Sequence, residues 1–218
     1  MQISSSGILL IDKLKGITSF DVIRILRKKL GKKKMGHAGT LDPLASGLMI
    51  IGIDKGTKKL NDFLKLPKVY EAEVLLGIQT TTGDMEGKII AQKNVETVSM
   101  DDTNKVLENM VGKIILPVPI YSAIKIASKP LYKYARTNLA VRPPSKEMEI
   151  FWIKLINSSL CTNPKNSLII SIELEVASGT YIRSIAEEIG RRLGYPATTK
   201  NLRRTKIGDF KIEDAQVL

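Results

Sequence analysis

The chain has 218 residues, 43% of them hydrophobic, which suits one large domain with a sizeable core. Its 34 Lys and Arg residues against 22 Asp and Glu give a formal net charge of +12. Such an excess favours a polyanionic partner, nucleic acid first, although a lysine-rich composition inherited from an AT-rich genome is an alternative. A single cysteine, Cys161, excludes an internal disulfide framework, and one Cys with one His excludes the usual zinc clusters.

Targeting and nucleotide-binding motifs are not found in the sequence. The apolar run 8–11 is too short for a signal peptide, and no run approaches the roughly 20 residues that span a bilayer. We therefore expect a cytoplasmic protein without a membrane partner. Neither a phosphate-binding P-loop nor a dinucleotide Gly-x-Gly-x-x-Gly is present, which argues against an ATPase or a dinucleotide enzyme.

In the first third of the chain, periodicity predicts a short buried strand over 7–13. A helix capped by Thr18 or Ser19 is expected to follow through Leu30, with Gly31 at its end. A second apolar strand is expected over 48–53, and then a short helix that Thr57 caps and Pro67 ends. The alternating segment 69–76 predicts a strand with one buried side.

Further along, we expect a helix over 101–111, a non-helical segment over 117–123, and an exposed basic stretch over 125–142. Strands are predicted over 149–157 and 168–176, and a helix opens near Arg183 and runs to Leu193. A basic turn and a final strand close the chain over 202–210. Because helices and strands are interspersed without strict alternation, the fold class is α+β around one mixed sheet.

The loop Gly36 to Gly47 places one carboxylate, Asp42, on a restricted backbone. Pro43 pushes Asp42 toward an extended conformation, and glycines upstream permit close approaches that a side chain would block. A carboxylate held this way is a candidate nucleophile, because fixed geometry removes much of the entropic cost of attack. The same residues also fit a helix start with Asp42 as N-cap and Pro43 at the first helical position.

Eight blocks in order resemble the tRNA pseudouridine synthase B (TruB) family. They are Gly7 to Lys13, Gly36 to Gly47, Lys68-Val69-Tyr70, Gly83-Asp84-x-x-Gly87, Tyr121 to Lys125, Leu131 to Arg136, Ser178 to Arg183, and Asn201-Leu202-Arg203-Arg204. The resemblance covers nearly the whole chain. It implies a pseudouridine-synthase fold, with a mixed, mostly antiparallel sheet, flanking helices and a central RNA-binding cleft, as one catalytic domain over 1–218.

The resemblance also implies the reaction: isomerisation of the T-loop uridine of tRNA, position 55 in tRNA nomenclature, to pseudouridine. The target base would be flipped out of its stack. No cofactor and no metal are implied. Tyr121 to Arg142 corresponds to an inserted segment that folds over the RNA loop, where Lys, Arg and Tyr suit phosphate contact and base stacking.

Site roles follow from the resemblance residue by residue. Asp42 matches the nucleophile, Tyr70 would stack on the flipped uracil, and Arg183 would pair with the catalytic aspartate and keep it ionised. His37 would fill the gap that the departed base leaves in the T loop. The remaining matches to substrate-binding positions are Lys13, Asp84, Leu202 and Tyr181.

Two departures from the family pattern are visible. Leu14 stands where proline is usual, and the chain ends at Leu218, where family members commonly continue into a small RNA-binding domain. We expect a monomer that binds the T arm of tRNA. The alternatives are a pseudouridine synthase for another RNA stem-loop and a non-catalytic tRNA-binding or remodelling protein.

Overall fold

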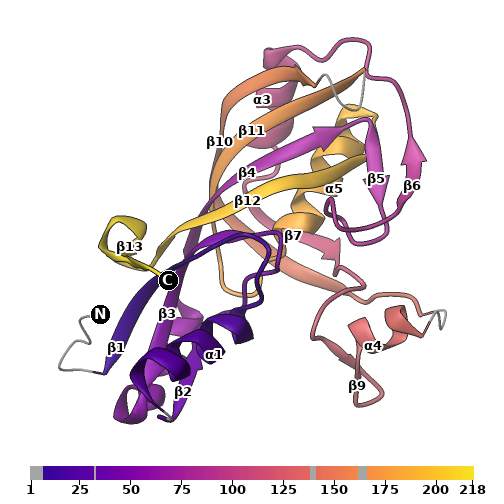
Figure 1. Cartoon of the computed structure of the whole chain (residues 1–218). Helices are drawn as coiled ribbons and strands as arrows, with labels where there is room; N and C mark the ends of the chain where they lie inside the picture. Colours follow the sequence, from indigo (N-terminus) through magenta and orange to yellow (C-terminus); the bar gives the residue numbers. More distant parts are fainter. Residues whose placement is uncertain (1–6, 32, 138–140, 162–165) are drawn as a thin grey trace. The chain divides into compact units, whose positions relative to one another are not determined.

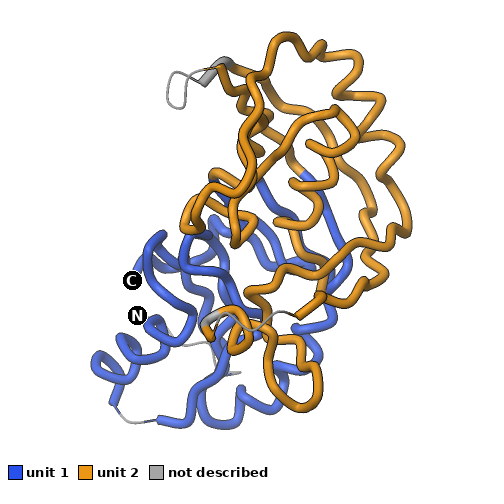
Figure 2. Tube along the Cα trace, turned by 90° about the vertical axis from the view of Figure 1, so that its right-hand side faces the viewer, with its two compact units in different colours: residues 1–71, 174–178, 201–218 blue, residues 72–173, 179–200 orange. Residues whose placement is uncertain are grey.

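The computed structural model describes residues 7–31, 33–137, 141–161 and 166–218 (Figure 1). The chain forms two compact units: unit 1 contains residues 1–71, 174–178 and 201–218, and unit 2 contains residues 72–173 and 179–200 (Figure 2). Residues 138–140, which belong to the predicted basic insertion over 121–142, lie outside the described residues, and so does Lys32.

A mixed sheet supplies the framework of the fold. Its strand order is β14-β1-β3-β12-β4-β11-β10-β7, with β2 added on β3 and β13 on β12. The pairing of β1 with β3 is antiparallel, and that of β3 with β12 is parallel. Three strands contain residues of both units: β4 (Lys68–Leu76), β11 (Ser167–Val176) and β12 (Ala197–Ile207). Mixed pairing with interspersed helices confirms the α+β class.

Unit 1 is built around the N-terminal strands. Its other elements are β1 (Ile8–Lys13), α1 (Ser19–Leu30), β2 (Met35–His37), β3 (Ser46–Ile53), the 3-10 turn η1 (Asp54–Lys59), α2 (Leu60–Lys65), β13 (Phe210–Lys211), η2 (Ile212–Asp214) and β14 (Gln216–Val217). Leu48, Ile50 and Ile207 are fully buried in one cluster. The rings of Phe63 and Phe210 close it edge to face at 5.3 Å.

Unit 2 combines strands with the helices α3, α4 and α5. Its elements are β5 (Ile78–Thr80), β6 (Ile89–Gln92), α3 (Met100–Glu108), β7 (Gly112–Pro117), β8 (Lys125–Ile126), β9 (Lys129–Pro130), α4 (Leu131–Arg136), β10 (Ser145–Cys161) and α5 (Ile182–Leu193). Helices α3 and α5 pack together, α3 against β10 and α5 against β7. No helix in the described ranges is long and apolar enough to cross a membrane.

Helix α1 confirms the sequence prediction down to its cap. Thr18 accepts a hydrogen bond from the Asp21 backbone N–H, and the Asp21 carboxylate accepts one from the Thr18 N–H. This reciprocal capping box satisfies two N–H groups that a helix start leaves free. The apolar residues Val22, Ile23 and Leu26 are buried, as their spacing predicts.

Two other predictions are wrong. Thr57 caps no helix, because it lies inside η1 and its hydroxyl donates to the Asp54 carbonyl oxygen, while α2 follows from Lys59 without a side-chain cap. The basic segment near Leu202 is no turn but the second half of the long strand β12. The chain turns only after Ile207, at Gly208.

Candidate active site

Asp42 lies in a β-turn and not at a helix start. The Ala45 N–H donates to the Asp42 carbonyl oxygen at 3.0 Å, Pro43 occupies the second turn position, and β3 begins at Ser46. Proline favours that position because its ring fixes φ near the value the turn requires. The helix-start interpretation of this segment is therefore wrong, and the Asp42 side chain is half-buried at a tight corner.

A buried serine holds the chain just before Asp42. Ser19, the first residue of α1, is 3% exposed. Its hydroxyl accepts a hydrogen bond from the Leu41 N–H at 2.9 Å and donates to the Leu41 carbonyl oxygen at 3.0 Å. One side chain thus satisfies both backbone polar groups of Leu41, the residue before Asp42. This holds in place the backbone from which the Asp42 side chain projects.

The residue after Asp42 is held as well. The Pro43 carbonyl oxygen accepts from the Gly16 N–H at 2.8 Å and lies 3.5 Å from the Lys13 ammonium. Lys13 is fully buried and also donates to the carbonyl oxygens of Leu14 and Ile17. Lys13 therefore ties the loop after β1 to the Asp42 turn, and a substrate-binding role for it stays a prediction.

Behind this loop lies a buried arginine that the sequence analysis did not single out. Arg204 of β12 is 1% exposed. Its Nε donates to the Leu48 carbonyl oxygen at 2.8 Å, and its Nη2 donates to the Gly39 carbonyl oxygen at 3.2 Å. The guanidinium thereby joins strand β3 to the glycine turn upstream of Asp42.

His37 is the last residue of β2, and its side chain is half-buried. Burial, and then the charge of Arg204, lower the pKa of His37 below its usual value of 6.5. Its Nδ1 atom is buried without a hydrogen-bond partner in the described part of the chain. At neutral pH the imidazole is therefore uncharged.

Two predicted site residues lie on strands beside buried cations. Tyr70 is 8% exposed and lies two residues beyond Lys68 on β4, while Leu202 is 9% exposed and lies two residues before Arg204 on β12. Because side chains alternate along a strand, each aligns with its neighbouring cation on one face. Lys68 donates to the carbonyl oxygens of Leu64 and Leu66, both at 2.6 Å.

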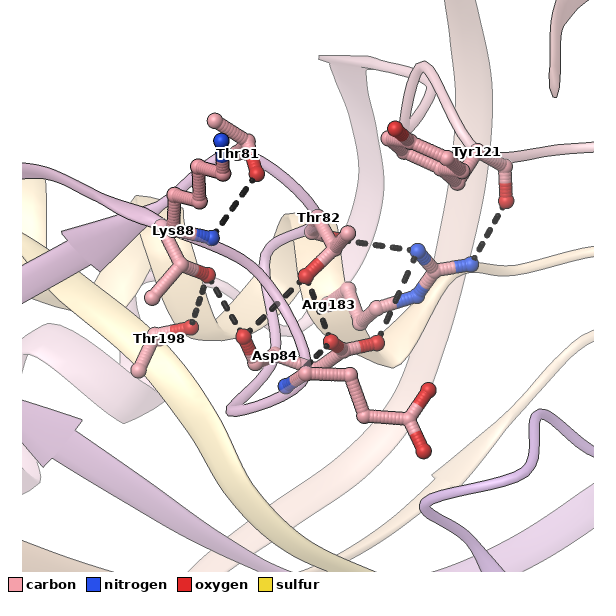
Figure 3. A network of polar contacts seen from close by, with 9 residues as sticks. Thr81, Thr82, Asp84, Lys88, Tyr121, Arg183 and Thr198 are labelled. Atoms are coloured by element: carbon pink, nitrogen blue, oxygen red, sulfur yellow. Dashed lines mark hydrogen bonds and ion pairs between the residues drawn. The ribbon is translucent and has the colours of Figure 1, made fainter. Parts of the chain in front are cut away.

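In unit 2, Arg183 and Asp84 are brought together (Figure 3). Arg183 lies in the first turn of α5 and is 6% exposed. Its Nη1 donates to the Thr82 carbonyl oxygen at 2.8 Å and lies 3.9 Å from the Asp84 carboxylate, and its Nη2 donates to the Tyr121 carbonyl oxygen at 3.0 Å. The guanidinium therefore links the loop after β5 to the segment before β8.

Asp84 itself is held in its turn. Its carboxylate accepts from the Thr82 hydroxyl at 2.5 Å and from the Glu86 N–H at 3.1 Å, the hydrogen bonding of an Asx-turn. The Thr80 hydroxyl donates to the Asp84 carbonyl oxygen at 2.6 Å. These contacts fix the carboxylate in the turn, facing Arg183.

Two further side chains lie close to Arg183 in the sequence, one just before α5 and one within it. Tyr181 precedes the helix, with the Lys146 ammonium 6.0 Å from its ring centre. Glu187 lies one turn after Arg183, and burial raises its pKa against the opposing effects of a Gln79 hydrogen bond and the Arg183 charge. The burial of Glu187 was not predicted from the sequence, because an acidic residue among other charged residues on a helix is usually exposed to solvent.

The eight predicted site residues divide between the units. Unit 1 holds Asp42, Tyr70, His37, Lys13 and Leu202, and unit 2 holds Arg183, Asp84 and Tyr181. Within unit 1 the structure ties Lys13 to the Asp42 turn, and within unit 2 it pairs Asp84 with Arg183. The pairing of Arg183 with Asp42 stays a prediction.

A comparison with protein families matches residues 27–182 to the TruB family pseudouridylate synthase, N-terminal domain. The match spans most of the chain and includes the Asp42 turn, β4 and the Asp84 turn. The chain belongs to this family. TruB membership confirms the resemblance seen in the sequence and the pseudouridine-synthase fold.

Relatives named tRNA pseudouridine synthase B support the assignment to the TruB family. The protein from Lactobacillus delbrueckii subsp. bulgaricus is 38% identical over 98% of this chain and 72% of its own length. That from Fusobacterium nucleatum is 42% identical over 95% and 69%. That from Endomicrobium trichonymphae is 38% identical over 96% of this chain and 88% of its own length.

Solved structures agree on the fold. A chain in the crystal structure of a Cbf5–Nop10–Gar1 complex matches 97% of this chain with a TM-score of 0.74 and 27% identity. A chain from an H/ACA ribonucleoprotein bound to a substrate RNA containing 2′-deoxyuridine matches with a TM-score of 0.69 and 25% identity. This chain spans about half of each, 52% and 50%.

The buried lysine of this TruB-family chain gives a pH-dependent contribution to stability. Burial, and then the Arg204 charge, lower the pKa of Lys68 from 10.5 to about 8. Between these values the unfolded chain holds a proton that the folded chain has lost, so Lys68 makes stability rise with pH in that window. Below about pH 8 Lys68 is protonated in both the folded and the unfolded chain, so the free-energy cost of burying its charge does not change with pH.

We expect this rise to reach at most about 3 kcal/mol, from 1.36 kcal/mol per pKa unit. Urea unfolding of the wild type and of Lys68→Met, measured from pH 7 to 10.5, isolates the contribution. The difference between the two unfolding free energies should stay flat up to about pH 8 and then change in favour of the wild type. A difference that does not vary with pH over the whole range would contradict a depressed lysine pKa.

Proposed function

We propose that this chain converts a uridine in the T loop of tRNA to pseudouridine, with Asp42 as the nucleophile. Membership of the TruB family and relatives named tRNA pseudouridine synthase B support the reaction and the RNA. The observation that carries the role of Asp42 is its turn. Hydrogen bonds to Leu41 and Pro43 hold the backbone on both sides of a half-buried carboxylate.

The reaction is an isomerisation and needs only groups of this kind. The N1–C1′ bond breaks, the base turns, and a C5–C1′ bond forms, while C5 loses a proton and N1 gains one. One carboxylate suffices for a covalent adduct, at the base or at C1′. A pre-set carboxylate lowers the barrier because its orientation is not lost in the approach to the transition state.

The other site residues receive roles in this proposal. Tyr70 stacks on the flipped uracil, Arg183 pairs with Asp42 and keeps it ionised, and His37 fills the gap in the T loop. Leu202 forms an apolar part of the pocket. Lys13, Asp84 and Tyr181 complete the substrate-binding set, Lys13 through its contact with the Asp42 turn.

Binding of the T arm depends on positive charge in this proposal. The chain carries a net charge of +12, and the segment 121–142 includes the exposed lysines Lys125 and Lys133. In the same segment the Lys129 ammonium lies 4.6 Å from the Tyr134 ring centre. Tyr134 is half-buried, and a tyrosine beside lysines suits stacking on unpaired bases. We propose that the chain acts as a monomer.

Tritium release from tRNA labelled at uridine C5 tests the function. The wild-type chain should release label from unmodified transcript, and mapping should place pseudouridine in the T loop. Release with the modification in another stem-loop would favour a synthase for a different RNA. Tight binding without any release would favour the non-catalytic tRNA-binding protein.

Ser19→Ala should slow turnover more than it weakens RNA binding. The change leaves both polar groups of Leu41 without their partner, so the Asp42 loop loses its anchor. We expect a stability loss of about 1–3 kcal/mol and a roughly tenfold lower kcat. Ser99→Ala is the matched control, because it removes a helix cap in unit 2, on α3. An equal loss of kcat in both variants would deny Ser19 its positioning role.

A further inference from the structure

Phe20, the second residue of α1, has a largely exposed side chain. It is 61% exposed, whereas the other two phenylalanines of unit 1, Phe63 and Phe210, pack on each other. An aromatic side chain loses rotamer freedom in a helix, so helix propensity does not favour it at this position. Neither burial nor propensity accounts for Phe20, which makes its ring a candidate for contact with a partner.

Phe20 lies next to the support of the Asp42 turn. The residue before it, Ser19, binds both backbone polar groups of Leu41, and Leu41 directly precedes Asp42. Phe20 and Asp42 are thus each one residue away from a direct contact between α1 and the loop. A flexible ligand that reaches the carboxylate can therefore also reach the ring.

A row of basic side chains continues from Phe20 along the same face of α1. Arg24, Arg27 and Lys28 follow it at spacings of four, seven and eight residues, and all three are exposed. Residues at these spacings lie on one side of a helix, and the buried apolar residues of α1 lie on the other. We call this face the α1 strip. At a rise of 1.5 Å per residue it extends for about 12 Å.

The charge of the α1 strip suits a polyanion. Arg24 pairs with Asp21, which is the only acidic residue of the helix. No carboxylate in the described ranges pairs with Arg27 or Lys28. Cations that follow phosphates, together with an aromatic ring that stacks on a base, are the pattern of sites for unpaired nucleic acid. A protein partner would call for a larger apolar centre than one ring.

We propose that the α1 strip binds the RNA substrate, with Phe20 stacked on an unpaired base of the loop that holds the target uridine, and Arg27 and Lys28 on phosphates of the adjoining stem. The inference rests on the proposed function, which supplies the RNA. The order of the contacts follows the helix. Its first turn, with Phe20, lies beside the support of the Asp42 turn, and its cations lie further along toward the other end.

Phe20→Trp gives a direct signal of stacking. The chain has one tryptophan, Trp152 of β10, so the variant made together with Trp152→Phe fluoresces from position 20 alone. An unmodified T-arm hairpin should quench this fluorescence. A fully paired RNA of the same length should not, because its bases are not free to stack on a side chain. Equal quenching by the two RNAs, or none by either, would overturn the stacking contact.

Phe20→Ala should weaken binding of the hairpin about tenfold and binding of the paired RNA less than twofold. Phe20→Tyr keeps a ring and should bind like the wild type. Phe151→Ala is the matched control, because Phe151 is a 44% exposed phenylalanine on β10 in unit 2. It should change both affinities less than twofold. Equal losses in the two alanine variants would overturn the role of Phe20. If Phe20→Ala does not fold, the quenching experiment decides.

The cations of the α1 strip are tested by salt dependence. Lys28→Met should weaken binding of both RNAs about threefold and lower the slope of log affinity against log salt concentration by about 0.7–0.9, the loss of one phosphate contact. Lys105→Met removes an exposed lysine from α3 in unit 2 and should leave the slope unchanged. Equal changes in slope would assign the effect to net charge and overturn the phosphate contact.

Failure of this inference and failure of the proposed function are separate results. Quenching and affinity are measured without turnover, and label release is measured without either. Quenching by the hairpin without label release would contradict the proposed reaction and support the α1 strip. Label release with no quenching and with unchanged affinity in Phe20→Ala would overturn the α1 strip as an RNA site, leaving it to a protein partner, and would support the proposed reaction.

Discussion

Asp42→Asn should abolish pseudouridine formation and leave the fold and RNA binding intact. Asparagine is nearly the same size as aspartate, and the hydrogen bond of the turn uses the Asp42 backbone carbonyl, not the side chain. An amide cannot form the covalent adduct, so we expect label release to fall at least about 1,000-fold. Release from C5-labelled tRNA under single-turnover conditions, at matched RNA occupancy, measures the loss.

Asp62→Asn is the control, because Asp62 is an exposed acid on α2 in the same unit. It makes the same chemical change and should release label at the wild-type rate. Retained release in Asp42→Asn would remove the nucleophile from the proposal, and loss of RNA binding together with release would show that the change disturbs the loop as a whole.

Gly47→Ala should prevent folding of unit 1 or destabilise it severely. Gly47 has a φ of +110°, and a Cβ there would lie 2.2 Å from the Arg204 carbonyl oxygen and 2.6 Å from its nitrogen. These are backbone atoms of the paired strand β12, so no side-chain rotation relieves the clash. We expect a loss of at least about 4 kcal/mol, or insoluble protein, by chemical denaturation and circular dichroism.

Gly112→Ala separates the clash from the backbone conformation. Gly112 has a φ of +97°, but nothing lies within 4 Å of the position its Cβ would take. This variant should cost only about 1–2 kcal/mol, the cost of a left-handed conformation for a residue with a side chain. Similar losses in the two variants would mean that the β3–β12 contact at Gly47 is less tight than described.

The sequence correctly predicted those helices and strands whose formation depends on residues close to one another in the sequence. The capping residues and apolar spacing of α1, the alternation of β4 and β11, and the position of α5 were all read from a few adjacent residues. The error at Asp42 has the same origin. Asp-Pro-Leu-Ala is compatible with a helix start and with a turn, and the strand that begins at Ser46 decides between them.

The supports of the Asp42 loop could not be predicted in the same way. Ser19 was identified only as a possible cap, yet its hydroxyl binds Leu41, 22 residues away. The sequence analysis placed Arg204 in a basic turn. Its burial could not be predicted, because it depends on the pairing of β12 with β3, where Arg204 binds Leu48, 156 residues earlier in the chain. Contacts of this range leave no periodic signal. The assignment of roles to Asp42 and Arg183 came from the family resemblance, and one catalytic domain over 1–218 stays a prediction.

From the hydrogen bonds of Arg204 we also expect an order of events during folding. The Gly39 turn receives its support from a residue 165 positions later in the chain. During synthesis, the loop that carries Asp42 emerges early and waits for β12 before it can take its final shape. Closing so long a loop is slow, because chain entropy is lost before the contact forms. We therefore expect the reactive carboxylate to become ordered among the last parts of unit 1.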